Sequence, residues 1–334
     1  MPQSENISPT NYSNLSPDLI LDAIESCGYE ANGSMLALNS YENRVYRIEV
    51  NHGQAIVAKF YRPLRWTDDA ILEEHQFSLT LLENELPIVA PLVNKDNQSL
   101  FHYQGYRFAL FPMQGGRWPE FQNVGDYEWM GRFLGRIHHI GANCQFKHRH
   151  QISLETYGEQ SAHYLLSKQF IPMHIETAYE TVTDDLFKLI KACYDLAGNT
   201  PIIRLHGDCH RGNILWREQG PHFVDLDDAC NGPAIQDLWM LLSGDQSESS
   251  VQLSHLLKGY QAFADFDYRQ LNLIEALRTL RMMNYAAWLA KRWQDPSFKI
   301  AFPWFDSTNY WEQHLQELRE QLYLIQEPVM KLSE

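Results

Sequence analysis

The sequence predicts an α+β protein with a small antiparallel-sheet domain near the N-terminus and a larger, mainly helical domain after it. Between residues 35 and 61, apolar side chains recur mostly at every second position, which is typical of half-buried strands. From residue 126 onwards they recur at helical spacing instead. A Gly- and Pro-rich segment, Pro112–Pro119, separates the two patterns, as links between domains often do.

The N-terminal part begins with polar residues and then alternates helices with strands. Ser16, Pro17 and Asp18 have the residue types that open a helix, and Gly28 is suited to end it. A second helix is expected from the cap Thr67 to Leu86. Strands are expected at 35–38, 45–50, 55–61, 88–93, 99–103 and 106–111.

These patterns divide the chain into four parts. We expect a flexible tail at 1–15, a small N-lobe at 16–112, a hinge at 113–119 and a C-lobe at 120–334. The C-lobe helices are expected at about 126–144, 176–198, 232–242, 251–263, 268–293 and 309–325.

Composition and charge argue against several classes of protein. A net charge of −15 disfavours nucleic acid as a partner, because the phosphate backbone requires a basic surface. No apolar run approaches the ~18 residues of a membrane helix, and the first residues lack a secretory signal, so we expect a cytoplasmic protein without a membrane contact. The five scattered cysteines are expected to be reduced, and the 14 histidines lack zinc-site spacing.

Residues 205–226 contain the strongest chemical signal of the chain. Asp208 is followed five positions later by Asn213, and an apolar strand ends at Asp225. Phosphoryl transfer from ATP needs a carboxylate beside the attacking hydroxyl, and an amide and a second carboxylate on the metal ions. The Asp-x-x-x-x-Asn spacing equals that of the protein-kinase catalytic loop. The sequence therefore predicts a kinase, with a two-lobed protein-kinase-like fold.

Each of these side chains has an expected role. Asp208 is the general base or orients the hydroxyl, while Asn213 and Asp225 supply oxygen ligands to Mg²⁺, which prefers such ligands beside phosphates. Asp227 and its neighbour Asp228 are either further metal ligands or surface charge. Two more residues are expected to be structural: Asp237 as a partner of the loop backbone, and His138 as a core histidine.

Lys59 and an acid of the next helix complete the expected nucleotide site. Lys59 lies in Ile56-Val57-Ala58-Lys59, which is similar to the strand-lysine motif of kinases, although a lysine on an edge strand also serves solubility. Glu73 and Glu74 are both candidates to pair with it, and we favour Glu74 because its helical neighbours are less polar. The backbone of Pro112 and Met113 would bind the adenine edge.

Several segments together resemble a known family. The residues 206–216 and 223–229 resemble the aminoglycoside phosphotransferase and choline kinase superfamily, whose members are relatives of protein kinases. More narrowly, the segments 38–46, 59–63, 73–77 and 231–242 resemble the stress response kinase A family of gammaproteobacteria. The resemblance covers nearly the whole chain except the tail.

The resemblance implies an ATP- and Mg²⁺-dependent, cytoplasmic, monomeric serine/threonine protein kinase that acts in stress survival. It implies that Asp208 is the proton acceptor and that Ser40 contacts ATP. It also implies that Asn213 and Asp225 bind the metal and that Asp225 is essential for turnover. The turn 39–44 departs from the glycine-rich loop of protein kinases, so a polar turn would cover the phosphates.

The acceptor of the phosphate remains open in the sequence. A protein hydroxyl is one possibility, and a small alcohol such as choline, homoserine or an aminoglycoside is the alternative, since the same lobes serve both. A binding module without catalysis is disfavoured by the intact Lys59, Asp208, Asn213 and Asp225. The acceptor groove is expected among residues that could equally belong to the core, namely Arg281, Tyr285, Trp288, Arg292 and Trp293.

Overall fold

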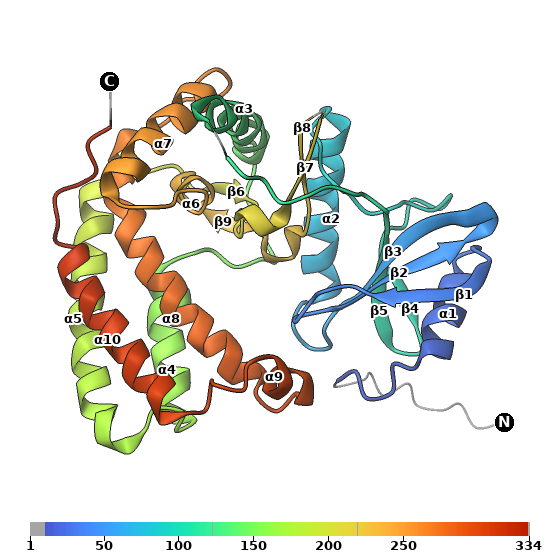
Figure 1. Cartoon of the computed structure of the whole chain (residues 1–334), viewed down its shortest axis with the longest axis horizontal. Coiled ribbons are helices and arrows are strands. Elements are labelled where there is room, and N and C mark those ends of the chain that lie inside the picture. The colour runs from blue at the N-terminus through green and yellow to red at the C-terminus, as the bar shows by residue number, and fades with distance from the viewer. Residues whose placement is uncertain (1–10, 122, 219, 333–334) are drawn as a thin grey trace. The chain divides into compact units, whose positions relative to one another are not determined.

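The computed structural model of the chain describes residues 11–121, 123–218 and 220–332 (Figure 1). The described residues form two units. Unit 1 contains the chain up to Pro119 together with Gly212–Asp227, and unit 2 contains Glu120–Arg211 and the chain from Asp228. The segment 212–227 thus belongs with the N-terminal sheet, whereas the sequence placed it in the C-lobe. The expected α+β class is confirmed, with a small antiparallel sheet in unit 1 and mainly helices in unit 2.

Unit 1 is built on a five-stranded antiparallel sheet with the order β1-β2-β3-β5-β4. Two helices, α1 and α2, belong to the same unit. Their caps are the expected ones, because the side chains of Ser16 and Thr67 each accept a hydrogen bond from a backbone N–H group in the first turn of the helix. The elements are α1 (Pro17–Ser26), β1 (Ala31–Ala37), β2 (Arg44–Val50), β3 (Gln54–Phe60), α2 (Asp68–Glu83), β4 (Phe101–Tyr103) and β5 (Tyr106–Pro112).

The two faces of this sheet carry separate apolar clusters. Phe108 and Leu110 of β5 pack with Ile24 of α1, while Ala109, which points to the other face, packs with Ile71 of α2. This alternation follows from the two-residue period of a strand. The sheet is therefore covered by a helix on each face, and the middle strand β3 is held rigidly between β2 and β5.

The expected strand at 88–93 is wrong. This segment is extended, but it forms an isolated parallel bridge at Ile88 with Phe223 instead of a ladder. Pro87 and Pro91 lack the N–H group that a paired strand needs, and proline is confined to edges and strand ends for that reason. The apolar pattern of the segment therefore marks burial rather than pairing.

The expected tail also needs a correction. Residues 1–10 lie outside the described residues, but residues 11–15 pack on unit 1. Tyr12 Oη donates a hydrogen bond to the Phe60 carbonyl at 2.9 Å, and the Tyr12 ring stacks on Tyr106 with centroids 6.5 Å apart. Tyr106 Oη in turn donates to the Asn11 carbonyl at 3.1 Å. The tail expected at 1–15 therefore does not include residues 11–15.

A hairpin, β7 (Ile214–Arg217) and β8 (Gly220–Phe223), joins unit 1 from the distant segment 212–227. Val89 N–H donates to the Phe223 carbonyl at 2.9 Å, which ties β8 to the segment after α2. Trp216 and Arg117 exchange two backbone hydrogen bonds of 2.7 and 3.2 Å, which tie β7 to the chain after β5. Both ends of the hairpin are thereby fixed to the sheet domain.

Unit 2 is mainly helical, and most of its helices lie where the sequence predicts them. The short α4 and α9, a π-helix at Leu154–Glu159, and a 3₁₀ turn at Tyr268–Leu273 that precedes α8 were not predicted. The elements are α3 (Val124–Gly141), α4 (Gln160–Ser167), α5 (Met173–Ala197), β6 (Ile203–Leu205), β9 (Cys230–Gly232), α6 (Ile235–Trp239), α7 (Gln246–Tyr260), α8 (Ile274–Arg292), α9 (Pro296–Ala301) and α10 (Thr308–Leu324). Among the described residues, no helix has the length and apolar character needed to span a membrane.

Glycines allow α3 and α7 to pack with their backbones in contact. A Cβ atom added at Gly131 of α3 would collide with the Leu256 carbonyl of α7, and one added at Gly259 of α7 would collide with the Glu128 carbonyl of α3. The neighbours are backbone atoms, which cannot rotate away as a side chain can. The absence of side chains at these positions therefore sets the distance between the two helices.

We predict that Gly259→Ala lowers the free energy of unfolding by about 1–3 kcal/mol, the usual cost of overpacking. Alanine favours helices more than glycine does, so a loss of stability would have to come from the collision. Urea denaturation followed by circular dichroism measures the change. Gly115→Ala is the control, because its added Cβ would meet no atom within 4 Å. Equal stability of the two variants would contradict this account of the packing.

Candidate active site

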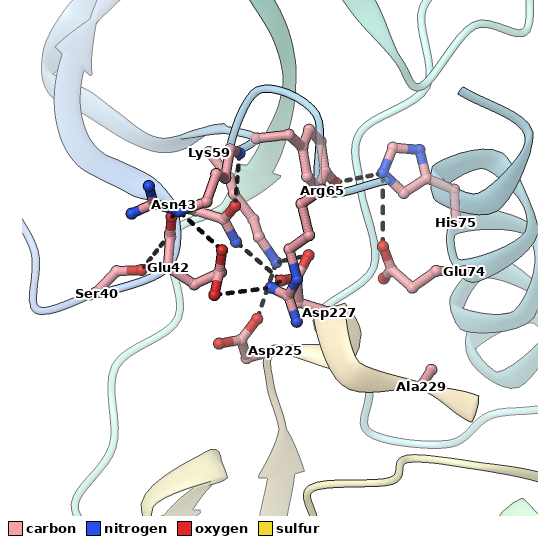
Figure 2. Close-up of polar contacts among 12 residues, drawn as sticks. Ser40, Glu42, Asn43, Lys59, Arg65, Glu74, His75, Asp225, Asp227 and Ala229 are labelled. Carbon is pink, nitrogen blue, oxygen red and sulfur yellow. Dashed lines mark hydrogen bonds and ion pairs between the residues drawn. The ribbon is translucent and has the colours of Figure 1, made fainter. Parts of the chain in front are cut away.

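Lys59 is placed by the middle strand of the sheet and points toward two carboxylates. Its Nζ donates to Asp225 Oδ1 at 2.8 Å and lies 3.3 Å from Asp227 Oδ1 (Figure 2). Because β3 pairs on both sides, the alternative of an edge-strand lysine that serves solubility is excluded. Lys59 instead binds the turn that follows β8, 166 residues further along the chain.

The ammonium group of Lys59 remains charged in this setting. Burial alone would lower the pKa of Lys59, because a charged group is less stable away from water. The negative charges of Asp225 and Asp227 outweigh burial and raise this pKa well above its usual value. Lys59 therefore keeps its positive charge at neutral pH and can neutralise phosphate oxygens.

The two carboxylates that hold Lys59 differ in their access to solvent. The side chain of Asp225 is 51% exposed, whereas that of Asp227 is 5% exposed. Asp225 has a φ of +59°, a left-handed conformation that aspartate tolerates better than most residues. Asp227 also accepts hydrogen bonds from Asn43 Nδ2 at 3.1 Å and from Arg65 Nη1 (Figure 2). Of the two readings of Asp227 that the sequence left open, surface charge is excluded.

A cavity of about 340 Å³ within unit 1 brings the expected nucleotide and metal residues together. One part of its wall is apolar, with Val45, Val57 and Val89 among the residues that line it. The expected site residues that line it are Ser40, Lys59, Glu74, Pro112, Met113, Asn213 and Asp225. The cavity thus combines an apolar wall with a cation, carboxylates and an amide.

Of the two acids on α2, Glu74 is the one that turns inward. Its side chain is buried, while Glu73 is partly exposed, as the less polar neighbours of Glu74 predicted. The charge of Glu74 contributes to the raised pKa of Lys59, after the larger contributions of Asp225 and Asp227. Glu74 Oε2 also lies 3.8 Å from His75 Nε2 (Figure 2). The same His75 nitrogen bonds to the Tyr61 hydroxyl.

Asn213 and Asp225 suit a hard cation that also binds phosphate. They offer an amide oxygen and a half-exposed carboxylate to the same cavity, and Val224 N–H donates to the Asn213 carbonyl, which links the two ends of the hairpin. Mg²⁺ is commonly bound by one or two such side chains, with substrate phosphates and water completing the shell. In the part of the chain that is described, no group of three or more His, Cys, Asp or Glu is arranged to hold a metal. The residues present therefore fit Mg²⁺ bound together with phosphates.

Asp208 lies in unit 2, in the loop after β6. Arg281 Nη1 of α8 lies 2.6 Å from Asp208 Oδ1, and His210 Nε2 lies 3.4 Å from Oδ2. Burial alone would raise the pKa of Asp208, but the hydrogen bond from His210 and the charge of Arg281 outweigh it. The pKa of Asp208 is therefore held well below its usual value, and the carboxylate is ionised at neutral pH.

The backbone of this loop is held by Asp237 of α6, as the sequence predicted. Asp237 accepts hydrogen bonds of 2.9 Å from the N–H groups of His206 and Gly207. His138 is confirmed as a core histidine: it is buried and bonds to Asp237 and to the Tyr260 hydroxyl, at 3.1 Å each. The loop of Asp208 is thus fixed by a buried carboxylate rather than by the chain alone.

The sequence missed several residues around these sites. Asn43 and Arg65 bind Asp227, but no local spacing connects them with a residue more than 160 positions away. In the expected acceptor groove, Arg281 contacts Asp208 and the exposed Tyr285 stacks on Trp288, with centroids 5.7 Å apart. Trp293, in contrast, is buried in the core of unit 2.

Comparisons with known proteins show the family of the chain. Residues 35–274 match the model of the phosphotransferase enzyme family, APH. The chain is 44% identical over 328 residues to stress response kinase A of Escherichia coli K12, covering 98% of this chain and 99% of that protein. It is 43% identical over 322 residues to the serine/threonine protein kinase RdoA of Salmonella typhimurium LT2, covering 96% and 97%.

Solved structures share the fold at low sequence identity. Amicoumacin kinase hAmiN, in complex with AMP-PNP, Ca²⁺ and Ami, aligns with a TM-score of 0.71 and 17% identity over 95% of this chain and 96% of its own. A microcompartment-associated aminopropanol kinase aligns with a TM-score of 0.71 and 15% identity over 95% of this chain and all of its own. The family resemblance read from the sequence is confirmed. The chain therefore belongs to the phosphotransferase enzyme family and is a kinase related to stress response kinase A.

Proposed function

We propose that this kinase transfers the γ-phosphate of ATP, with Mg²⁺, to serine or threonine hydroxyls of proteins as part of a bacterial stress response. The observation that carries the proposal is the charged Lys59 held by an exposed carboxylate in a cavity that Asn213 also lines. The names of the relatives supply the remaining parts: one is named a stress response kinase and one a serine/threonine protein kinase. We further propose that the protein acts as a cytoplasmic monomer.

The cavity of unit 1 is suited to a nucleotide. Its volume of about 340 Å³ lies in the range of small-molecule sites, which combine apolar walls with a few placed polar groups. The valines of the wall would contact the adenine ring, and the backbone at Pro112 and Met113 would bind its polar edge. Lys59 would neutralise the phosphates, with Ser40 of the turn 39–44 as a further contact.

Asn213 and Asp225 would hold Mg²⁺ on the phosphates. When bound, the metal neutralises the charge that develops on the transferred phosphoryl group. Asp225 is suited to this role because its side chain is half exposed, because it lines the cavity and because it lies close to Lys59. The ammonium group would bind the negatively charged phosphate oxygens, while the neighbouring carboxylate would bind the cation that accompanies them.

Asp208 would orient the acceptor hydroxyl. Its low pKa keeps it ionised, so it can accept a hydrogen bond from a serine or threonine O–H group. A carboxylate with a low pKa is a weak base, and a loose phosphoryl transition state requires little proton removal before the bond to phosphorus forms. Asp208 therefore acts mainly by aiming the oxygen of the acceptor.

The name of a relative favours a protein acceptor over a small alcohol. The Arg281 guanidinium lies 2.6 Å from the carboxylate that would receive the hydroxyl, so the two opposite charges offset each other. This ion pair therefore does not distinguish a neutral serine or threonine from a cationic alcohol. We propose a protein acceptor because one relative is named a serine/threonine protein kinase. A small alcohol such as choline, homoserine or an aminoglycoside is the alternative.

We predict that Asp225→Asn reduces Mg²⁺-dependent turnover by at least about a hundredfold, as expected when a charged group of a phosphoryl-transfer site is lost. The rate of ADP release from ATP, measured over a range of Mg²⁺ concentrations, tests this. Asp96→Asn is a matched control, because Asp96 lies in an exposed turn of the same unit. Turnover by Asp225→Asn at the rate of the control would reject Asp225 as the metal ligand.

We predict that γ-labelled ATP transfers its label to serine and threonine residues of proteins in a bacterial lysate, and not to choline, homoserine or aminoglycosides. Asp208→Asn should abolish the labelling, because it removes the charge that orients the hydroxyl. Phosphoamino acid analysis identifies the labelled residue. Label that enters a small alcohol and leaves the proteins unlabelled would establish the alternative function instead.

A further inference from the structure

The two carboxylates beside Lys59 are not equivalent, and the proposed phosphoryl transfer uses only the exposed one. Asp225 is open to the cavity, while Asp227 is enclosed and does not line it. An ionised carboxylate that is removed from water needs charged or hydrogen-bonding partners in compensation. The partners of Asp227 therefore indicate what it does.

Asp227 binds three side chains from three different parts of unit 1. Lys59 comes from β3, with Nζ 3.3 Å from Oδ1, and Arg65 comes from the segment before α2 and donates to Oδ2. Asn43 comes from the end of the turn 39–44 and donates to Oδ2 at 3.1 Å (Figure 2). One carboxylate thus joins the lysine, the turn that would cover the phosphates, and the segment that leads into α2.

The turn itself is held by side chains that converge on Asn43 and Glu42. Asn43 Oδ1 accepts a hydrogen bond from the Arg62 N–H at 3.0 Å, and the Asn43 N–H donates to Ser40 Oγ at 3.3 Å. Glu42 lies 2.8 Å from Arg62 Nε and 3.7 Å from Arg65 Nη1. The backbone freedom of a glycine-rich loop is absent here, and the shape of the turn depends on this polar network (Figure 2).

A metal ion in the cavity would bind Asp225 but not Asp227. A cation with its phosphates can reach Asp225 from the cavity, and its positive charge would compete with Lys59 for that carboxylate. Asp227 is saturated by Arg65 and Asn43 and would keep its contact with Lys59. Lys59 would then be held from one side while its other side faces the phosphates.

We propose that Asp227 is a positioning residue for nucleotide binding: through Arg65, Asn43 and Lys59 it keeps the lysine and the turn 39–44 in place when metal and phosphates bind Asp225. It is not a metal ligand. The inference rests on the proposed function, because it requires that ATP binds in the cavity of unit 1. It assigns Arg65 and Asn43 to the same structural network, so the three residues should behave as one group.

The test compares Asp227→Asn with Asp225→Asn by calorimetric binding of a non-hydrolysable ATP analogue, with and without Mg²⁺. Asp227→Asn should weaken binding of the analogue by about tenfold to a hundredfold in both conditions, the usual effect of losing a hydrogen bond to a charged group. Its half-saturating Mg²⁺ concentration should equal that of the unmodified protein. Asp225→Asn should instead lose the enhancement of binding by Mg²⁺. Glu83→Gln, on the exposed face of α2, is the control that should bind normally.

A second comparison tests the network. Arg65→Lys keeps the positive charge but not the geometry of the guanidinium. It should weaken binding of the ATP analogue in the same way as Asp227→Asn. The variant with both substitutions, Arg65→Lys and Asp227→Asn, should bind the analogue no more weakly than the weaker-binding single variant. The effects of substitutions within one network are not additive. Arg65→Lys also keeps the inference testable if Asp227→Asn does not fold, which thermal unfolding would reveal.

The failures of the two proposals are distinguishable. If the unmodified protein does not bind the analogue, the proposed function fails. If it binds, but Asp227→Asn or a folded Arg65→Lys binds equally well, the positioning role of Asp227 fails alone. A raised Mg²⁺ requirement of Asp227→Asn, with additive effects in the double variant, would make Asp227 a metal ligand and overturn the inference.

Discussion

The charge of Lys59 and the two carboxylates that balance it are the interaction on which unit 1 depends. A buried ammonium without a counter-ion would be unstable, and a carboxylate as enclosed as Asp227 would be unstable without its cations. Together they join the middle strand of the sheet to a turn 166 residues away. The hairpin β7–β8 must therefore stay against the sheet, and its backbone bonds to Val89 and Arg117 keep it there.

Unit 2 uses the same principle around Asp208. Asp237 holds the loop through two backbone N–H groups, and Arg281 balances the charge of Asp208 itself. In each unit, a partly exposed aspartate has the expected chemical role, and a buried aspartate holds the groups around it. Asp227 does so for Asp225 in unit 1, and Asp237 does so for Asp208 in unit 2. Such support determines geometry in catalytic sites, where a displacement of about 1 Å is costly.

Local patterns in the sequence were enough to predict the strand of Lys59 and the inward turn of Glu74, because periodicity determines which way a side chain points. The supporting role of Asp237 was also expected, from its place on a helix after the loop. They could not predict the contacts of Arg65 and Asn43 with Asp227, which join segments distant in sequence. The apolar run at 88–93 was misread because burial and strand pairing produce the same pattern, and prolines prevent the pairing here. The packing of Tyr12 was missed because one aromatic residue in a polar segment gives no periodic signal.

The central claim is that the charge of Lys59 forms the phosphate-binding end of the cavity in unit 1. The most direct measurement is the affinity of Lys59→Met for a non-hydrolysable ATP analogue with Mg²⁺, determined by calorimetry beside Lys95→Met, which removes a lysine from an exposed turn. We expect Lys59→Met to bind the analogue at least about tenfold more weakly, a loss of about 1.4 kcal/mol of binding free energy. Lys95→Met should bind the analogue as the unmodified protein does. Equal affinity of the two variants would contradict the claim.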